Sequence, residues 1–174
     1  MVRVIAVAWG LCSLAACGAP RTLNMSRPAA AAEYAPFLSP STPTGAIQGQ
    51  AFMRTRGGGV VLGAGAPVTI DPATTFAREW YEQTGLTVDW FWVAPRDSLF
   101  GAARRTAVVD AQGNFLVDSL PAGRYLVRTV VQWEAPTTGY GTSTQGGVVS
   151  ELVEVIAGRT TRVIIQDTRS VYAR

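Results

Sequence analysis

Four acidic side chains in the middle of the sequence are the first candidates for chemistry. They are Asp71, Glu79, Glu82 and Asp89. Two carboxylates can hydrolyse a glycosidic bond when one has a raised pKa and the pair has a defined separation. The spacing here indicates no such pair, and it lacks the dense Asp, Asn and Gly pattern of a calcium loop. We therefore interpret these residues as solvated helix and loop positions.

The residue types that are missing exclude most other catalytic chemistry. The sequence contains no histidine, and all fifteen of its basic residues are arginine. This composition rules out a Ser-His-Asp triad, a Cys-His pair, a lysine Schiff base and a phosphate-binding loop. Zinc sites mostly need histidine or cysteine ligands. We predict that the protein is not an enzyme and holds no metal or cofactor. The net charge of +3, without a basic stripe, predicts no nucleic-acid binding.

Tryptophan side chains offer a different kind of site. Trp80, Trp90 and Trp92, together with Asp89, could stack on sugar rings and hydrogen-bond their hydroxyl groups. However, strand alternation places Trp90 and Trp92 on one face with Val88, and large aromatic side chains dominate protein cores. The sequence therefore favours core packing, with a sugar-binding surface as the alternative.

Two arginines are candidates for contact with a partner. Arg124 and Arg128 project from one face of a long β-prone run, where they could pair with the carboxylates of another protein. A solvated sheet face is the alternative interpretation.

Short β-prone segments separated by glycine and proline turns must position these residues. A two-residue alternation of apolar side chains is clearest over residues 45–54. Residues 74–83 predict one short helix, and residues 95–105 and 139–147 predict loops. A glycine turn at residues 157–159 predicts a hairpin. The pattern predicts an all-β fold, an antiparallel β-sandwich of about seven strands with one short helical insertion. The other expected strands are 60–62, 67–70, 87–93, 106–109, 115–117, 125–133, 148–156 and 160–166.

The segment from Asp110 to Tyr125 carries a turn and strand motif. It resembles the signature hairpin of carboxypeptidase regulatory-like domains, which are transthyretin-like sandwiches. The matching positions are Asp110, Gly113, Phe115, Val117, Leu120, Pro121, Gly123 and Tyr125. The resemblance extends over about residues 45–166, apart from an insertion at residues 71–105. It implies the fold and no catalytic residues, because one fold carries many functions.

An uncharged run of apolar and small residues, 4–14, lies close to the N-terminus. It ends in the sequence Leu14-Ala15-Ala16-Cys17. The run is too short to span a membrane, which takes about 20 apolar residues. The motif resembles the lipobox of bacterial lipoproteins. It implies a signal peptide at residues 1–16, lipidation of Cys17 and a membrane anchor facing the periplasm. Gly18 in place of aspartate favours the outer over the inner membrane. The alternative is an ordinary secretory signal cut after Ala16 or Ala19, with Cys17 unmodified.

Five prolines and an alanine run follow the cysteine. They predict a semi-stiff spacer over residues 17–44, which we call the spacer segment. A short docking spot at Tyr34, Phe37 and Leu38 is the alternative. The sandwich would then occupy residues 45–167 and a tail residues 168–174. We expect a lipid-anchored protein-interaction or structural module with an envelope protein as partner. The alternative is a glycan- or peptidoglycan-binding lipoprotein that uses the tryptophans.

Replacing Cys17 with alanine tests the predicted anchor. Each acyl methylene buried in the bilayer contributes about 0.8 kcal/mol, so removing the acylation site removes the attachment. We expect Cys17→Ala to move the protein from the membrane pellet to the soluble periplasm after cell fractionation. Retention of the variant in the pellet would contradict the anchor.

Overall fold

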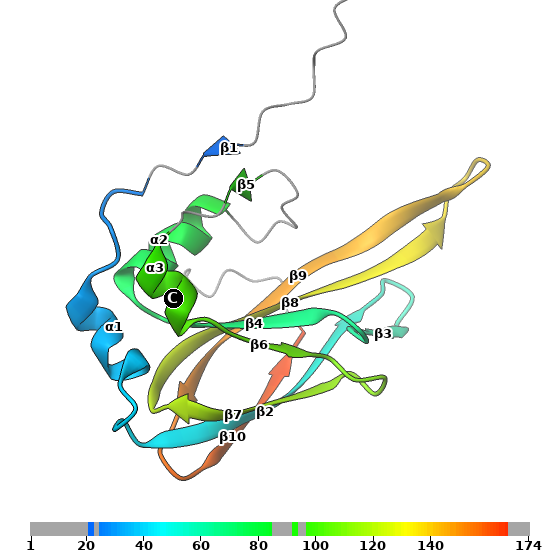
Figure 1. The fold of residues 1–174 in the computed structure, drawn as a ribbon. Coiled ribbons are helices and arrows are strands. Elements are labelled where there is room, and N and C mark those ends of the chain that lie inside the picture. The colour runs from blue at the N-terminus through cyan, green and yellow to red at the C-terminus, as the bar shows by residue number, and fades with distance from the viewer. Residues whose placement is uncertain (1–20, 23–24, 85–91, 94–96, 167–174) are drawn as a thin grey trace, which may run out of the picture.

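Two β-sheets face each other in the computed structural model, which describes residues 21–22, 25–84, 92–93 and 97–166 (Figure 1). In the first sheet, β2 pairs with strands on both sides and also with a short strand near its end. The members of this sheet are β2 (Thr44–Arg54), β10 (Thr160–Ile165), β7 (Asn114–Pro121) and β3 (Val60–Leu62). The order in the second sheet is β6 (Arg105–Val108), β4 (Pro67–Pro72), β8 (Gly123–Pro136) and β9 (Thr142–Val155). The predicted all-β sandwich is confirmed.

Strand alternation builds the core between the two sheets. In β2, Ile47 and Ala51 are fully buried, whereas Gln48 between them is exposed. In β8, Tyr125 and Val127 point into the same core. Such burial of alternate side chains gives the hydrophobic effect that holds the sheets together.

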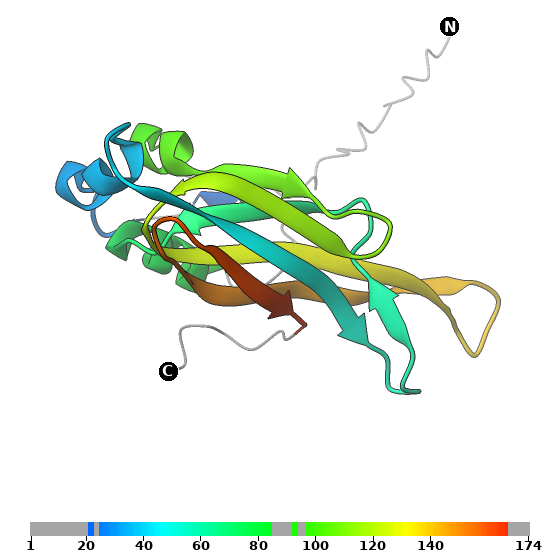
Figure 2. The ribbon, with the colours of Figure 1, turned by 90° about the horizontal axis from the view of Figure 1, so that it is seen from below.

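Three helices cover the outer side of the second sheet at one end of the sandwich (Figures 1 and 2). They are α1 (Ala31–Leu38), α2 (Thr75–Thr84) and α3 (Ser98–Ala103). Their buried side chains form a second apolar cluster, to which β8 contributes Leu126. Of the helices described, none is both long enough and apolar enough to cross a membrane. Two further short strands, β1 (Arg21–Thr22) and β5 (Trp92–Val93), pair in parallel.

Only α2 was expected from the sequence, over residues 74–83. Its apolar side packs inward as predicted, through Phe76, Ala77 and Trp80 among others. Helix α3 lies where a loop was predicted. Its signal is Asp97, whose carboxylate accepts hydrogen bonds from the amides of Leu99 and Phe100 and so caps the helix.

The spacer segment is not an extended spacer over its whole length. Residues 31–38 form α1, and Tyr34 in this helix is fully buried. The Phe37 ring packs edge-on against Tyr125, with ring centroids 5.4 Å apart. The prolines suggested an extended chain, but these two aromatic side chains gain more from burial against the domain. The alternative prediction, a docking spot at residues 34–38, therefore describes this part of the spacer segment.

The predicted hairpin around residues 157–159 is also wrong. Strand β9 pairs with β8 in the second sheet, whereas β10 crosses to the first sheet and pairs in parallel with β2. The turn is therefore a connection between sheets. Residues 142–147, expected within a loop, belong to β9 and continue its pairing with β8 as a long hairpin that projects from the sandwich (Figure 1).

The turns of the segment from Asp110 to Tyr125 form as predicted, but its two strands lie in different sheets. The Asp110 carboxylate accepts hydrogen bonds from the backbone amides of Asn114 and Gln112, and these bonds lower the pKa of Asp110. Gly113 has a φ of 83°. Gly123 has a φ of 152°, and a Cβ there would lie 2.7 Å from the Phe37 ring. This glycine therefore lets α1 approach the start of β8.

A β-branched residue at position 123 tests this close approach. Gly123→Val would strain the backbone and collide with Phe37, which we expect to cost about 2 kcal/mol and lower the melting temperature by roughly 4–8 °C. The matched control is Gly139→Val, because no atom lies within 4 Å of a Cβ at that position. Equal melting temperatures of the Gly123 variant and the wild type would contradict the packing of α1.

Candidate functional site

A buried ion pair connects the helices to the second sheet. Asp71 at the end of β4 is fully buried. The Arg104 side chain, which follows α3, donates from Nε and Nη2 to the two Asp71 oxygens at 2.7 and 2.8 Å. The hydroxyl group of Tyr81 on α2 donates to the same carboxylate. One carboxylate thus joins one strand and two helices.

Protonation behaviour follows from this arrangement. Burial alone would lower the pKa of Arg104, but the hydrogen bonds and negative charge of Asp71 outweigh it and raise that pKa. Burial, followed by the charge of Asp71, raises the pKa of the Tyr81 phenol. Arg104 also stacks on the Phe100 ring, 4.7 Å from its centroid. Arg104 therefore stays charged and Tyr81 stays neutral near neutral pH.

Helix α1 is joined to α2 by side-chain hydrogen bonds. The Thr74 hydroxyl group donates to the Tyr34 hydroxyl oxygen at 2.7 Å, and burial raises the pKa of Tyr34 to about 12. The Glu33 carboxylate accepts the amide of Thr75 at 2.7 Å. Glu33 thereby satisfies an amide that the first turn of α2 leaves without an intrahelical acceptor.

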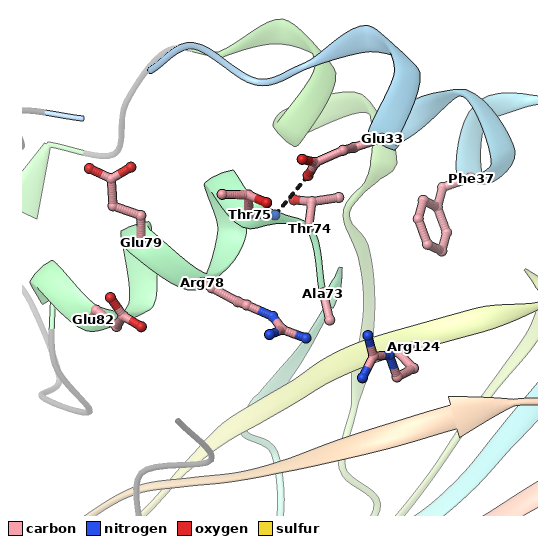
Figure 3. A pocket seen from close by; sticks show the side chains of 9 residues that line it. All are labelled: Glu33, Phe37, Ala73, Thr74, Thr75, Arg78, Glu79, Glu82 and Arg124. Atoms are coloured by element: carbon pink, nitrogen blue, oxygen red, sulfur yellow. Dashed lines mark hydrogen bonds between the residues drawn. The ribbon is translucent and has the colours of Figure 1, made fainter. Parts of the chain in front are cut away.

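An open groove lies where α1, α2 and the start of β8 meet (Figure 3). Its volume is about 610 Å³. Polar and charged side chains from both helices and the strand surround it, with Phe37 as its aromatic member. The lining residues are Glu33, Phe37, Ala73, Thr74, Thr75, Arg78, Glu79, Glu82 and Arg124.

Two of the three carboxylates in the groove accept hydrogen bonds from other groups of the chain. Glu33 bonds to Thr75, as described above. Glu79 accepts the Ser26 amide at 2.6 Å and the Ser26 hydroxyl group at 2.7 Å, and these bonds lower its pKa. Within the described residues, Glu82, Arg78 and Arg124 have no ion pair or side-chain hydrogen bond. These three are the charged groups that remain available to a ligand.

The groove residues do not form a metal cluster or a carboxylic acid with a raised pKa within the described part of the chain. Among the described residues, no group of three or more acidic, cysteine or histidine side chains could hold a metal ion. The pKa of Glu79 shifts downward, whereas a general acid working near neutral pH needs an upward shift. What the groove supplies is donors, one available carboxylate and an aromatic ring.

The candidates from the sequence end up in different environments. Trp80 is 7% exposed and packs in the helical cluster, so it offers no stacking surface. Arg128 is half-buried over the rings of Trp80 and Tyr81, so it does not lie on a solvated face. Arg124 is exposed and lines the groove. Of the two arginines, only Arg124 is therefore exposed enough to contact a partner.

The remaining candidates cannot be placed. Cys17, Asp89 and Trp90 lie outside the described residues. Trp92 belongs to β5, but its side chain is also outside the described part.

Sequence reasoning missed Glu33, Thr75 and Arg78 as site residues. The sequence did contain a signal for the helix that carries Glu33. The run from Ala29 to Ala35 is rich in helix formers, and Tyr34 and Phe37 have the three-residue spacing of one helix face. Together these features could have predicted α1 and its contact with the domain.

No protein-family model matches this sequence, and no curated protein matches it. Among solved structures, a "putative carbohydrate binding protein" from Pseudomonas aeruginosa is similar, with a TM-score of 0.67 and 25% identity. The match covers 83% of this chain and 100% of that one. A minor pilin of Streptococcus agalactiae has a TM-score of 0.38 and 15% identity, over 76% of this chain and 49% of its own. The Pseudomonas likeness favours a binding or structural module.

The bond between Ser26 and Glu79 predicts a pH dependence. Because the folded state lowers the pKa of Glu79 from 4.5, this contact stabilises the protein above that pH and is lost as the pH falls through the lowered value. We expect Glu79→Gln to lower the melting temperature at neutral pH. The difference from the wild type should vanish in acid, where both side chains are uncharged.

Thermal unfolding at neutral and at acid pH measures this effect. Glu82→Gln is the matched control, since Glu82 lies on the same helix without a described partner, and its melting temperature should follow the wild type. An equal deficit of Glu79→Gln at both pH values would contradict the assignment.

Proposed function

We propose that this chain is a non-catalytic, carbohydrate-binding module of the bacterial cell envelope, and that the groove holds the sugar. The observation that carries the proposal is the open groove of about 610 Å³, with charged groups that no other part of the described chain uses. It lies on a sandwich similar to that of the Pseudomonas "putative carbohydrate binding protein", at 25% identity.

The lining suits a saccharide. Binding pockets for small molecules measure about 300–1,000 Å³ and combine an apolar surface with a few placed polar groups. Phe37 gives the apolar surface, Glu82 can accept hydrogen bonds from hydroxyl groups, and the arginines can donate to ring and hydroxyl oxygens. The groove is open to solvent, so a sugar could enter it directly.

The proposal also includes a lipid anchor at the N-terminus and the absence of catalytic activity. The Leu14-Ala15-Ala16-Cys17 motif supports lipidation at Cys17 and a periplasm-facing position at the outer membrane. The internal bonds of Glu33 and Glu79 leave Glu82 as the available carboxylate in the groove, and a glycosidase needs two. The turn motif supports a kinship with carboxypeptidase regulatory-like, transthyretin-like domains.

A second candidate is a protein-interaction module that uses the outer face of the first sheet. Leu116 on β7 and Ile164 on β10 are 61% and 57% exposed. In the strand register, Leu116 is the neighbour of Gln48 and Ile164 is the neighbour of Gln50 on the intervening β2. Two apolar side chains beside two amides make a surface that an envelope protein could cover.

Binding to a glycan panel tests the proposed function. With the full-length protein, we expect NMR shift changes on saccharide addition to concentrate at the groove. Glu82→Ala should weaken binding about tenfold, because a hydrogen bond to a charged group is lost. The control is Asp118→Ala, an exposed carboxylate on β7 of the other sheet.

Two results would contradict the proposal. One is an absence of shift changes with every saccharide tested. The other is a set of changes confined to the outer face of the first sheet, which would place the sugar site there and not in the groove.

A further inference from the structure

We infer that the sugar bound in this groove is acidic, and that Arg78 and Arg124 hold its anionic group. This inference rests on the proposed function and names the class of its ligand. The observation behind it is the convergence of two unpaired guanidinium groups at one end of the groove.

The two arginines come from different elements. Arg78 extends from α2 and Arg124 from the start of β8, and both guanidinium groups lie at the same end of the groove, beside Ala73 (Figure 3). Neither side chain has a hydrogen bond or ion pair within the described part of the chain. Glu154 is the cross-strand neighbour of Arg124 in β9, but no ion pair joins their side chains.

The arginines deeper in the fold contrast with this pair. Arg104 is bound to Asp71, and Arg128 lies over aromatic rings. The two guanidinium groups repel each other, and an anion held between them would pair with both. A guanidinium group also offers planar, paired donors that match carboxylate and phosphate oxygens.

The groove carboxylates keep their charges, but none of them forms an ion pair with Arg78 or Arg124 in the described part of the chain. Glu33 is committed to the α2 amide of Thr75, and Glu79 is committed to Ser26. Glu82 has no described partner and lies toward the opposite end, one helical turn beyond Arg78 along α2 (Figure 3). The groove is therefore bipolar, with available donors at one end and an available acceptor at the other.

A sugar that carries an acidic group matches both ends. Its carboxylate or phosphate would lie between Arg78 and Arg124, while a ring hydroxyl group donates to Glu82. The Phe37 ring, half-buried against Tyr125, borders the same space and offers an apolar surface to the sugar ring. A neutral sugar would offer the arginine pair no anionic group, and it would therefore lack a charge-assisted hydrogen bond.

Calorimetric titration of the full-length protein with matched ligands tests this inference. The probes are a short galacturonate oligomer, its methyl ester, mannose 6-phosphate and a glutamate oligomer. We expect the galacturonate oligomer to bind roughly tenfold or more tightly than its ester, because esterification removes the charge and keeps the sugar. Mannose 6-phosphate shows whether phosphate serves as well as carboxylate.

Variants then locate the effect. Arg78→Gln and Arg124→Gln should each weaken binding of the acidic oligomer by a larger factor than binding of the ester. Because neither side chain has an internal partner, the melting temperatures should stay at the wild-type value. Arg162→Gln on β10, an exposed arginine of the other sheet, is the matched control and should bind like the wild type.

The outcomes separate this inference from the proposed function. Equal binding of the acid and the ester would overturn the inference and leave a neutral-sugar module. Unchanged affinity in both groove variants would overturn it as well. Binding of the glutamate oligomer in preference to any sugar would identify an acidic-peptide site instead. An absence of binding to every saccharide would overturn both proposals.

Discussion

The ion pair between Asp71 and Arg104 is the constraint on which the candidate site depends. A carboxylate with no exposed surface is costly unless its charge is paired and its oxygens are hydrogen-bonded. Here the strand β4 supplies the acid, while α2 and the residue after α3 supply its donors. The sheet can bury this side chain only when both helices are in place. The charge therefore fixes where the helices lie, and apolar packing around Trp80 then stabilises them there.

The groove is a consequence of that helical layer. Once α2 is fixed, its first turn presents Thr75 and Arg78 toward the start of β8. Helix α1 completes the wall through contacts of Tyr34 and Phe37 with α2 and the sheet. Helix α1, which lies within the predicted spacer segment, is therefore part of the folded domain.

How much the sequence could predict depended on the range of the interactions involved. The sandwich was predictable because alternation in strands such as β2 and the turn from Asp110 to Gly113 are local signals. The parallel pairing of β10 with β2 joins residues far apart in the chain, and a glycine turn suggested a simpler hairpin. The groove was not predictable for the same reason. Its arginines are 46 positions apart in the numbering, and only the fold brings them together.

Hydrogen exchange of Asp71→Asn tests most directly whether this carboxylate holds the helices on the sheet. The substitution keeps the shape of the side chain and removes its charge. The account predicts that amides of α2 and α3 lose protection, while those of β2 and β7 in the opposite sheet keep theirs. Unchanged protection in both helices would contradict the account, and so would an equal loss of protection throughout the molecule.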